Sequence, residues 1–472
     1  MKNGISRRNF IQSISALSMS AALGGCEFIT QLIRNRPVRR DIATMSATDP
    51  NLIAYREAVR LMKALPPTDP RNWTRQAAIH QNFCPHGNWF FLPWHRAYLL
   101  SFERICQTLL NDKSFGLPYW NWSCNRAIPA PFWQSGSPLF HSPRTASASS
   151  MASANIVGQT AMESILSETD FELFASGFAT DLRGGSTFYG AIEGGPHNYI
   201  HGFVGGTMGS FMSPLDPVFW CHHNVIDYFW YEWNQRGNAN TNASSYVNFN
   251  IAGHMVDGNG NPITYQVGSL LLAPLLSYRY QPPLTCGPLR FHLTESVGLR
   301  RLLEQGSAIR FAPEREFPAI SGVERFTLNP TTRLQIPISA QTVNTASASL
   351  DRERLLLRIS DVRPPSGENF FVQVYLNLAD NEPASISSPA YAGSFAFFSD
   401  SSMQSMTFNY LVDISNAIER LRSAGRLDQN RANLVTLVTI PVEQDRPINQ
   451  TMSFGSLQPI TIRRQPQAVP PQ

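Results

Sequence analysis

The sequence predicts a mainly helical domain followed by an all-β, sandwich-like domain, so that the fold class overall is α+β. At 472 residues the chain is too long for one ordinary core, and 43% hydrophobic residues are typical of a well-packed globular protein. Apolar residues recur near every 3.6 positions in the first half, whereas residues 331–465 show short alternating runs separated by proline and glycine. We therefore expect one domain at residues 46–290 and a second at residues 331–465, joined by a linker at residues 291–330.

The first 26 residues indicate an export signal. Residues 6–11, SRRNFI, match a twin-arginine motif, and the mildly apolar residues 11–25 are too few to span a bilayer. The sequence LGGC ending at Cys26 resembles a lipoprotein cleavage site, which would leave a lipidated Cys26 as a membrane tether. A signal-peptidase site with small residues has much the same pattern, so both alternatives stay open. Because the twin-arginine route carries folded, cofactor-loaded proteins, we expect export to the periplasm or beyond in a bacterium, either free or membrane-anchored.

The helical domain is predicted to follow a polar, arginine-rich linker at residues 27–45. Helical spacing is clear at residues 55–62 and 97–110, and it returns at residues 216–234. Residues 134–160 are small and polar, and they predict a surface loop or insertion.

The second domain is predicted from short alternating runs that are typical of an antiparallel sandwich. These runs are residues 333–339, 354–359, 370–376, 394–398, 434–440 and 460–463. One helix is expected at residues 414–424, with Asp413 as its cap and Gly425 as its stop. The tail, residues 466–472, is predicted to be disordered.

Charge and cysteine usage exclude several classes of protein. The formal net charge is +4 and no basic run occurs outside the two ends, so nucleic-acid binding has no support. Five cysteines follow Cys26 without any C-x-x-C pair, which argues against a zinc ribbon or a thioredoxin-like site. Most of them are expected to be small buried side chains.

Seven of the ten histidines fall in two short, aromatic-rich stretches. The first contains His80, His86 and His95, and the second contains His197, His201, His222 and His223. On a helix His197 and His201 share one face, and Phe219, His223 and Asp227 form one stripe. Asp227 is therefore expected to accept a hydrogen bond from the far ring nitrogen of a histidine in this turn, which would fix the orientation of that ring.

Each stretch can supply three neutral imidazoles, enough to hold one metal ion. Imidazole suits copper, zinc and iron, whereas di-iron bundle sites use Glu and Glu-x-x-His, which are absent here. The residues alone therefore predict a pair of metal ions held almost wholly by nitrogen.

Two long motifs around these histidines resemble the superfamily of type 3 dicopper proteins, which includes tyrosinase, catechol oxidase and haemocyanin. The first motif contains HGNW at residues 86–89, PWHR at 93–96, Tyr98 and FER at 102–104. The second contains PHN at residues 196–198, His201, DPVFW at 216–220, and His223 with Asp227 four residues on. The resemblance covers about residues 40–280, ending at the Tyr-x-Tyr motif of residues 278–280.

The resemblance implies a four-helix-bundle core with two copper ions. One ion would be bound by His80, His86 and His95, and the other by His197, His201 and His223. His222 would be a supporting neighbour rather than a ligand. The spacing of Cys84 and His86 implies a thioether cross-link between sulfur and imidazole, as in fungal and molluscan members. His141, His254 and His292 lie outside the motifs.

The family's chemistry implies a tyrosinase, a polyphenol oxidase that uses O2 as co-substrate to hydroxylate monophenols and to oxidise o-diphenols to o-quinones. Glu193 and Asn198 would be catalytic by holding a water as general base for the phenol. Phe219 would pack beside the second copper and offer a face to the substrate. The β-rich domain also resembles the domain that covers the copper pocket in plant and fungal relatives, so it is expected to limit substrate entry.

Two other functions remain open. One is a catechol or o-aminophenol oxidase without activity on monophenols, and the other is a haemocyanin-like O2 carrier. The expected partners are small phenols, with a copper-loading chaperone as a further candidate. The sequence does not determine the oligomeric state.

Overall fold

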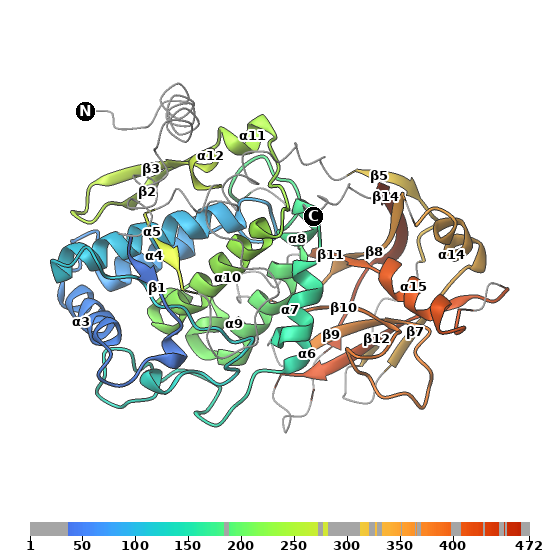
Figure 1. Cartoon of the computed structure of the whole chain (residues 1–472), viewed down its shortest axis with the longest axis horizontal. Helices are drawn as coiled ribbons and strands as arrows, with labels where there is room; N and C mark the ends of the chain where they lie inside the picture. The colour runs from blue at the N-terminus through green and yellow to red at the C-terminus, as the bar shows by residue number, and fades with distance from the viewer. Residues whose placement is uncertain are drawn as a thin grey trace, which may run out of the picture.

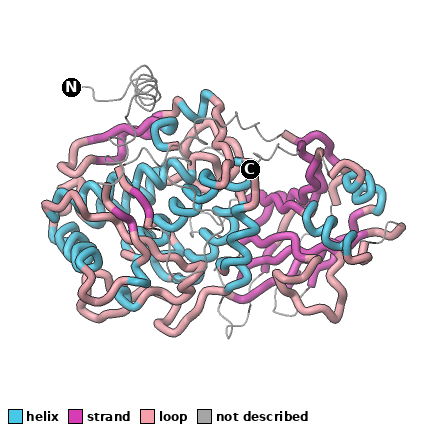
Figure 2. Tube along the Cα trace, viewed as in Figure 1, coloured by secondary structure: helices cyan, strands magenta, loops and turns pink. Residues whose placement is uncertain are grey.

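The computed structural model describes residues 36–183, 188–271, 277–281, 312–320, 326–327, 333–350, 352–363, 365, 370–397, 407–427, 430–442, 448 and 451–463. A helical part and a β-rich part lie side by side along the longest axis (Figures 1 and 2). The predicted fold class, a helical core followed by a β-rich domain, is confirmed.

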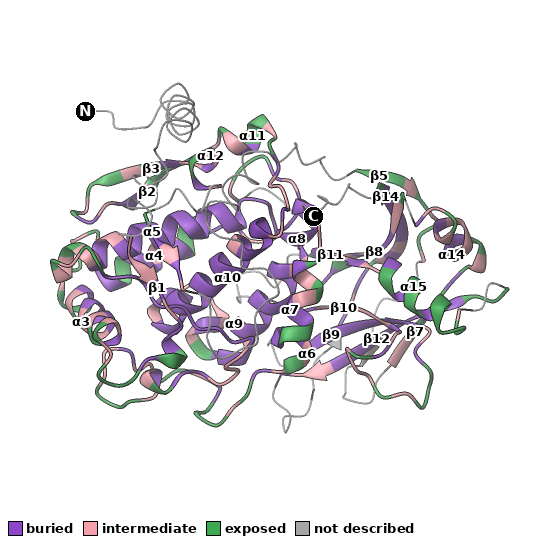
Figure 3. Cartoon of the chain, viewed as in Figure 1, coloured by how far each residue is buried: buried purple, intermediate pink, exposed green. Residues whose placement is uncertain are grey.

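The helical part is built around two long, buried helices, α5 (Phe91–Leu110) and α10 (Val218–Gln235), which pack against each other (Figure 3). Asn111 ends α5 in the left-handed conformation, with φ of 51°, which an asparagine tolerates better than most residues. The shorter α-helices of this part are α3 (Pro50–Ala64), α4 (Trp73–Phe83), α6 (Ala154–Val157), α7 (Gln159–Leu166), α8 (Phe171–Phe174), α9 (Asn198–Val204), α11 (Ser244–Val247) and α12 (Val267–Leu270).

Side-chain caps start α3 and α4. The Asp49 side chain accepts from the backbone N–H of Asn51, and Asn72 accepts from the backbone N–H groups of Thr74 and Arg75. These bonds satisfy donors that have no partner inside a helix.

The β-rich part consists of two four-stranded antiparallel sheets. One has the order β10-β9-β12-β7 and the other the order β11-β8-β14-β5. Their strands are β5 (Pro313–Glu316), β7 (Arg333–Ile338), β8 (Glu353–Val362), β9 (Phe370–Leu376), β10 (Tyr391–Phe395), β11 (Phe408–Asp413), β12 (Asn433–Pro441) and β14 (Ser456–Arg463). Helices α14 (Ala340–Ser347) and α15 (Ser415–Ser423) belong to the same part.

Three two-stranded pairings complete the described sheets. β1 (Val38–Arg39) pairs in parallel with β4 (Arg279–Tyr280), and β2 (Asn250–Val256) forms a hairpin with β3 (Pro262–Gln266). β6 (Phe326–Thr327) pairs with β13 (Thr451–Met452).

Three strands lie within the predicted linkers, and the one at residues 326–327 is β6. Residues 38–39, expected within a linker, form β1, and residues 313–316, also expected within a linker, form the edge strand β5. Both strands are short, and β5 is largely exposed and rich in charged residues, so neither shows the apolar alternation that marks a strand in sequence. The strands β2, β3 and β11 were likewise not predicted. The expected export signal and C-terminal tail lie outside the described residues.

Most of the described cysteines are small buried side chains, as expected, and one forms a disulfide bond. Cys84, Cys106 and Cys221 are buried and free, whereas Cys124 forms a disulfide bond. Among the residues that the structure describes, no helix is long and apolar enough to cross a membrane.

Arg354 of β8 joins the two parts. Its guanidinium donates two hydrogen bonds to the carboxylate of Glu168, at 2.6 and 2.5 Å, and two more to Asp413 of β11, at 2.8 and 2.6 Å. Glu168 follows α7, so this largely buried ion cluster contains groups from both domains.

A second buried ion cluster lies at the centre of the helical part, around Asp227 of α10. Its carboxylate accepts from Arg96 of α5 at 2.5 Å, from Arg39 of β1 at 3.4 Å, and from the hydroxyls of Tyr278 and Tyr280. Burial raises the pKa of Asp227, but the two guanidinium charges and the two hydroxyls outweigh burial, so that the pKa is lowered overall.

We expect Asp227→Asn to lower the free energy of unfolding by about 3–5 kcal/mol, because it leaves the buried Arg96 guanidinium without its charged partner, whereas Arg39 keeps Glu103. All nine tryptophans lie between residues 73 and 233, so tryptophan fluorescence during urea unfolding reports on the helical part. Because the folded pKa of Asp227 is lowered, the advantage of the wild type is complete above about pH 4 and disappears as the pH falls through that pKa.

Glu57→Gln is the control, since Glu57 and Arg60 form an exposed pair on α3. It should leave the unfolding midpoint unchanged. Equal midpoints for Asp227→Asn and the wild type would show that this cluster does not stabilise the fold.

Candidate metal centre

The histidines of the two sequence stretches come from four α-helices, one π-helical turn and one loop. His80 lies on α4, His95 on α5 and His201 on α9, and His222 and His223 are adjacent on α10. His86 lies in the loop before α5. His197 ends a π-helical turn, η3 (Glu193–His197), directly before α9. All of these side chains are buried except that of His86, which is half-buried.

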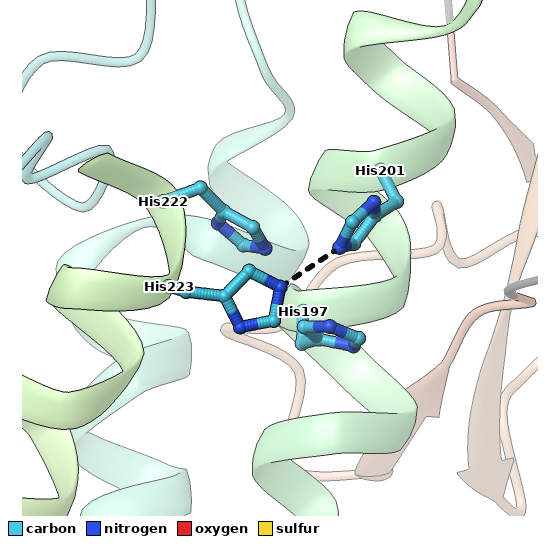
Figure 4. A group of neighbouring side chains, drawn as sticks. All are labelled: His197, His201, His222 and His223. Atoms are coloured by element: carbon cyan, nitrogen blue, oxygen red, sulfur yellow. Dashed lines mark hydrogen bonds between the residues drawn. The ribbon is translucent and has the colours of Figure 1, made fainter. Parts of the chain in front are cut away.

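The structure brings the two stretches together in one centre. His197, His201, His222 and His223 each offer a ligand atom, and these atoms lie within 4.8 Å of one another (Figure 4). The same holds for His80, His95 and His223. The rings of His86 and His197 are 5.5 Å apart between centroids, and those of His95 and His223 are 4.2 Å apart.

Backbone carbonyls fix the tautomer of three of these rings. The Nδ1 atom of His80 lies 2.7 Å from the carbonyl of Phe211, that of His95 lies 2.8 Å from Phe91, and that of His201 lies 2.6 Å from Met208. Because a carbonyl only accepts, each Nδ1 must carry the proton. Each Nε2 therefore has a lone pair, as a metal ligand requires.

The turn after α9 supplies one of these carbonyls. Gly205 and Gly206 adopt positive φ values of 65° and 57°, and a Cβ at Gly206 would meet the Pro143 carbonyl oxygen at 1.3 Å. Glycine is therefore required at Gly206, where the chain turns back to present Met208 to His201.

The protonation of the centre suits a metal ion. Burial lowers the pKa of His95 to about 3 and that of His201 to about 4, although a carbonyl hydrogen bond opposes the change in both. Burial first, and neighbouring imidazoles after it, lower the pKa of His80 and of His223 well below the ordinary value. All four rings are therefore neutral at physiological pH.

The free nitrogens also fit a metal ion. The Nε2 atoms of His80 and His95 are buried without a hydrogen-bond partner, which is costly in a protein interior. The Nε2 atoms of His201 and His223 are 3.3 Å apart. Two nitrogens bound at about 2.0–2.1 Å to one tetrahedral ion would be roughly 3.3 Å apart. An all-imidazole donor set of this kind suits copper.

His222 is held in a different tautomer. Its Nδ1 accepts from the indole N–H of Trp122 at 3.2 Å, so in the neutral ring the proton is on Nε2. An Nε2 that carries a proton cannot bind a metal, although it lies within reach of the other ligand atoms. This contact supports the prediction that His222 is a neighbour of the site and not a ligand.

The expectation that Asp227 orients a histidine is wrong. Its carboxylate is taken up by Arg96, Arg39, Tyr278 and Tyr280. Asp227 does lie one turn after His223 on α10. The elements that pack against α10 at Asp227 are α5, β1 and β4, and they supply guanidinium groups and a hydroxyl instead of an imidazole.

Phe219 lies against ligands of both predicted sites. Its ring centroid is 4.2 Å from that of His223 and 5.0 Å from that of His80, and the side chain is fully buried. Phe219 thus packs beside the second site as expected, and it also limits the space beside the first.

Cys84 and His86 are adjacent in space, with 3.5 Å between the cysteine Sγ and the histidine Nδ1. The Cys84 thiol is buried, and burial raises its pKa well above the ordinary value. Its position is compatible with the expected cross-link.

Glu193 and Asn198 have separate partners. Glu193 accepts from the backbone N–H of Gly87 at 2.6 Å and from the Ser176 hydroxyl at 2.5 Å. Because Gly87 follows His86, this buried carboxylate ties the η3 turn of the second site to a ligand loop of the first. The side-chain oxygen of Asn198 pairs with the Nδ1 atom of His197 at 2.9 Å. The expected water held between Glu193 and Asn198 stays a prediction.

Several groups of the centre carry no recognisable sequence signal. They are the carbonyls of Phe211 and Met208, the hydroxyl of Ser176 and the indole of Trp122. Backbone groups leave no pattern at all, and Trp122 lies in a loop about 100 positions from its partner. Trp94, beside His95, was visible only as part of a motif, and it donates to His254 at 2.9 Å.

Comparison with protein families matches the helical part to a tyrosinase domain. The common central domain of tyrosinase matches residues 70–164 and 134–236, and a domain family of unknown function, DUF7868, matches residues 322–450. A tyrosinase from Hahella sp. (strain CCB-MM4) is 26% identical over 468 residues, covering 85% of this chain and 95% of the relative. The chloroplastic polyphenol oxidase A1 of Vicia faba is 30% identical over 290 residues, which cover 52% of this chain. That match spans 48% of the Vicia faba protein, or about half of its length.

Solved structures share the whole fold. Latent apple tyrosinase superimposes with a TM-score of 0.66 at 21% identity, covering 90% of this chain and 97% of the apple chain. A functional unit of octopus hemocyanin superimposes with a TM-score of 0.52 at 16% identity, covering 90% of this chain and 99% of the octopus chain. Helical and β-rich parts therefore occur together in relatives from distant sources.

We expect His223→Ala to lower the copper content of the loaded protein from two ions per chain to one, because a ligand of the second ion is removed. His222→Ala, its matched control one position away, should retain two ions. Elemental analysis after copper loading and desalting measures both. The ligand assignment is wrong if His222→Ala loses an ion and His223→Ala does not.

Proposed function

Because the chain belongs to the tyrosinase and polyphenol oxidase family of type 3 copper proteins, we propose that it uses O2 to hydroxylate monophenols and to oxidise o-diphenols to o-quinones. The proposal depends above all on one observation, the buried centre of neutral imidazoles from two sequence stretches. When bound there, the copper pair supplies O2 binding and electron transfer.

In the proposed enzyme His80, His86 and His95 hold one copper, and His197, His201 and His223 hold the other. The carbonyls of Phe211, Phe91 and Met208 keep the rings in place. Burial of this centre excludes bulk water, which protects reactive species from side reactions.

Activity on monophenols requires a group that accepts the phenol proton. We propose that Glu193 and Asn198 provide it through a shared water, as the family resemblance implies. The Ser176 and Gly87 contacts of Glu193 support a second role, because they position the loop that carries His86.

The decisive experiment is O2 uptake by the copper-loaded, full-length protein with a monophenol and its matching o-diphenol. We expect consumption of O2 and quinone absorbance with both. Activity on the diphenol or on an o-aminophenol alone would assign a catechol or o-aminophenol oxidase. Reversible O2 binding without consumption would assign an O2 carrier. This alternative is retained because a functional unit of octopus hemocyanin shares the fold.

Glu193→Gln separates the two roles of that carboxylate in the same assay. A general base contributes about 10²–10⁴-fold to a rate, so the monophenol rate should fall by at least tenfold relative to the diphenol rate. Ser176→Ala is the control for positioning. If Glu193→Gln and Ser176→Ala depress both rates equally, Glu193 only positions the loop.

We also propose the thioether bond between Cys84 and His86. Its formation would remove one hydrogen from the Cys84 thiol and one from the imidazole carbon of His86, and O2, the co-substrate of the proposed reaction, would take up the two electrons and two protons as H2O2. In protein loaded with copper and exposed to O2, the peptide containing both residues should be lighter by two hydrogens in mass spectrometry. Alkylation of Cys84 in the denatured, loaded protein would disprove the bond, and Cys84→Ser gives the reference without a cross-link.

The β-rich domain is proposed to restrict access of phenols to the copper centre. The contact between β10 and the η3 turn supports this role, because it places the domain beside the second site. If removal of the domain from copper-loaded protein leaves the rate of phenol oxidation unchanged, the shielding role is wrong.

Export through the twin-arginine route is a further proposal, supported by the Cys124 disulfide, since such bonds persist in oxidising compartments. Fractionation of expressing cells tests it, and a purely cytoplasmic protein would contradict it. We also propose that Cys26 is lipidated, which mass spectrometry of the mature N-terminus tests. A copper-loading chaperone is a further proposal, and copper loading of the purified protein alone tests it.

A further inference from the structure

The ring of His197 is oriented by a side chain, whereas three other buried ligand rings are oriented by the backbone. His80, His95 and His201 each donate from Nδ1 to a backbone carbonyl of the helical part. His197 instead pairs its Nδ1 with the side-chain oxygen of Asn198, at 2.9 Å. The orientation of His197 therefore depends on how the Asn198 amide is held.

The other half of that amide is bound by the β-rich domain. The Nδ2 atom of Asn198 donates to the carbonyl of Ala396 at 3.1 Å, directly after strand β10. Ala396 is itself fixed, because its N–H donates to the carbonyl of Gly194 at 2.6 Å and its carbonyl also accepts from the Tyr410 hydroxyl at 3.2 Å. Asn198 is fully buried and Ala396 is 2% exposed, so water does not compete for these bonds.

The asymmetry of the amide transmits this contact to the metal site. A carbonyl only accepts, so the side of the Asn198 amide that faces Ala396 must be its NH2 group. Its oxygen must then face His197, whose Nδ1 must carry the proton and whose Nε2 must carry the lone pair. Without Ala396 the amide can turn over and present NH2 to the ring, which favours a proton on Nε2, and an imidazole in that form cannot bind a metal.

We infer that the β-rich domain positions the copper ligand His197 through the Ala396–Asn198–His197 hydrogen bonds, so that domain docking and copper binding at the second site strengthen each other. The inference rests on the proposed role of His197 as a copper ligand. It gives Asn198 a positioning role beside its proposed role in holding a water, and it gives the β-rich domain a part in the metal centre beyond covering it. Partners that orient a ligand typically change metal affinity 10–100-fold. Coupling between two binding events is reciprocal, so copper should stabilise the docked segment by a comparable factor.

Amide hydrogen exchange at Ala396 tests this coupling in the full-length chain, because that N–H donates across the domain boundary to Gly194. Copper-free and copper-loaded proteins are compared by mass spectrometry of peptides that cover residues 391–397. We expect copper to slow exchange at Ala396 by at least about 10-fold in the wild type. Unchanged exchange in protein that contains two coppers would overturn the inference and leave the proposed function intact, whereas failure to take up copper would contradict the proposed function itself.

Two substitutions separate the two hydrogen bonds of the Asn198 side chain, one to His197 and one to Ala396. Asn198→Asp keeps an acceptor for His197 but cannot donate to Ala396, so it should retain two coppers while copper no longer slows exchange at Ala396. Asn198→Ala removes both halves, and it should also weaken copper retention at the second site against a chelator. Tyr410→Phe is the matched control, since it removes the other hydrogen bond to the Ala396 carbonyl and should leave the effect of copper in place. The same copper effect in Asn198→Ala as in the wild type would overturn the inference.

Discussion

The buried carboxylate of Asp227 is the interaction on which the rest of the metal centre depends. It binds Arg96, which directly follows the predicted ligand His95 on α5, and it lies one turn after the predicted ligand His223 on α10. The ion pair therefore fixes how the two longest helices are placed along and around each other. A shift of one helix by a single residue would separate the rings of His95 and His223, which are 4.2 Å apart between centroids. Arg39 and the hydroxyls of Tyr278 and Tyr280 offset the cost of burying the charge.

The gathering of these histidines in one centre could be predicted from sequence, because a metal site of this kind demands one residue type at fixed helical spacing. His197 and His201 illustrate this, since four residues along a helix place both rings on one face. The family was recognised from the same motifs, whereas the α+β fold class followed from helical spacing in the first half and short alternating runs in the second. The role of Asp227 could not be predicted, because a helical stripe gives the face on which a side chain lies and not the neighbour that it meets.

The parts of the fold that sequence missed share a physical cause. Arg39 lies in a two-residue strand, where no periodicity can develop, and β5 is an exposed edge strand whose charged residues do not alternate with apolar ones. The carbonyls that orient His80 and His201 are backbone groups, present at every position of every protein. Tertiary contacts select them, and only the folded chain shows which ones are used.

The Arg354 cluster has a consequence for how the two domains come apart. Its guanidinium binds Glu168 from the helical part through two short hydrogen bonds, and the same group binds Asp413 from the β-rich part. Separating the domains would leave Glu168 without its cation, whereas Arg354 would keep Asp413, so the ion pair with Glu168 opposes separation. A protease that cuts the connecting chain would then produce two fragments that remain associated, and the nicked molecule would keep its shape. Release of the β-rich domain requires a second event that breaks the ion pair between Arg354 and Glu168.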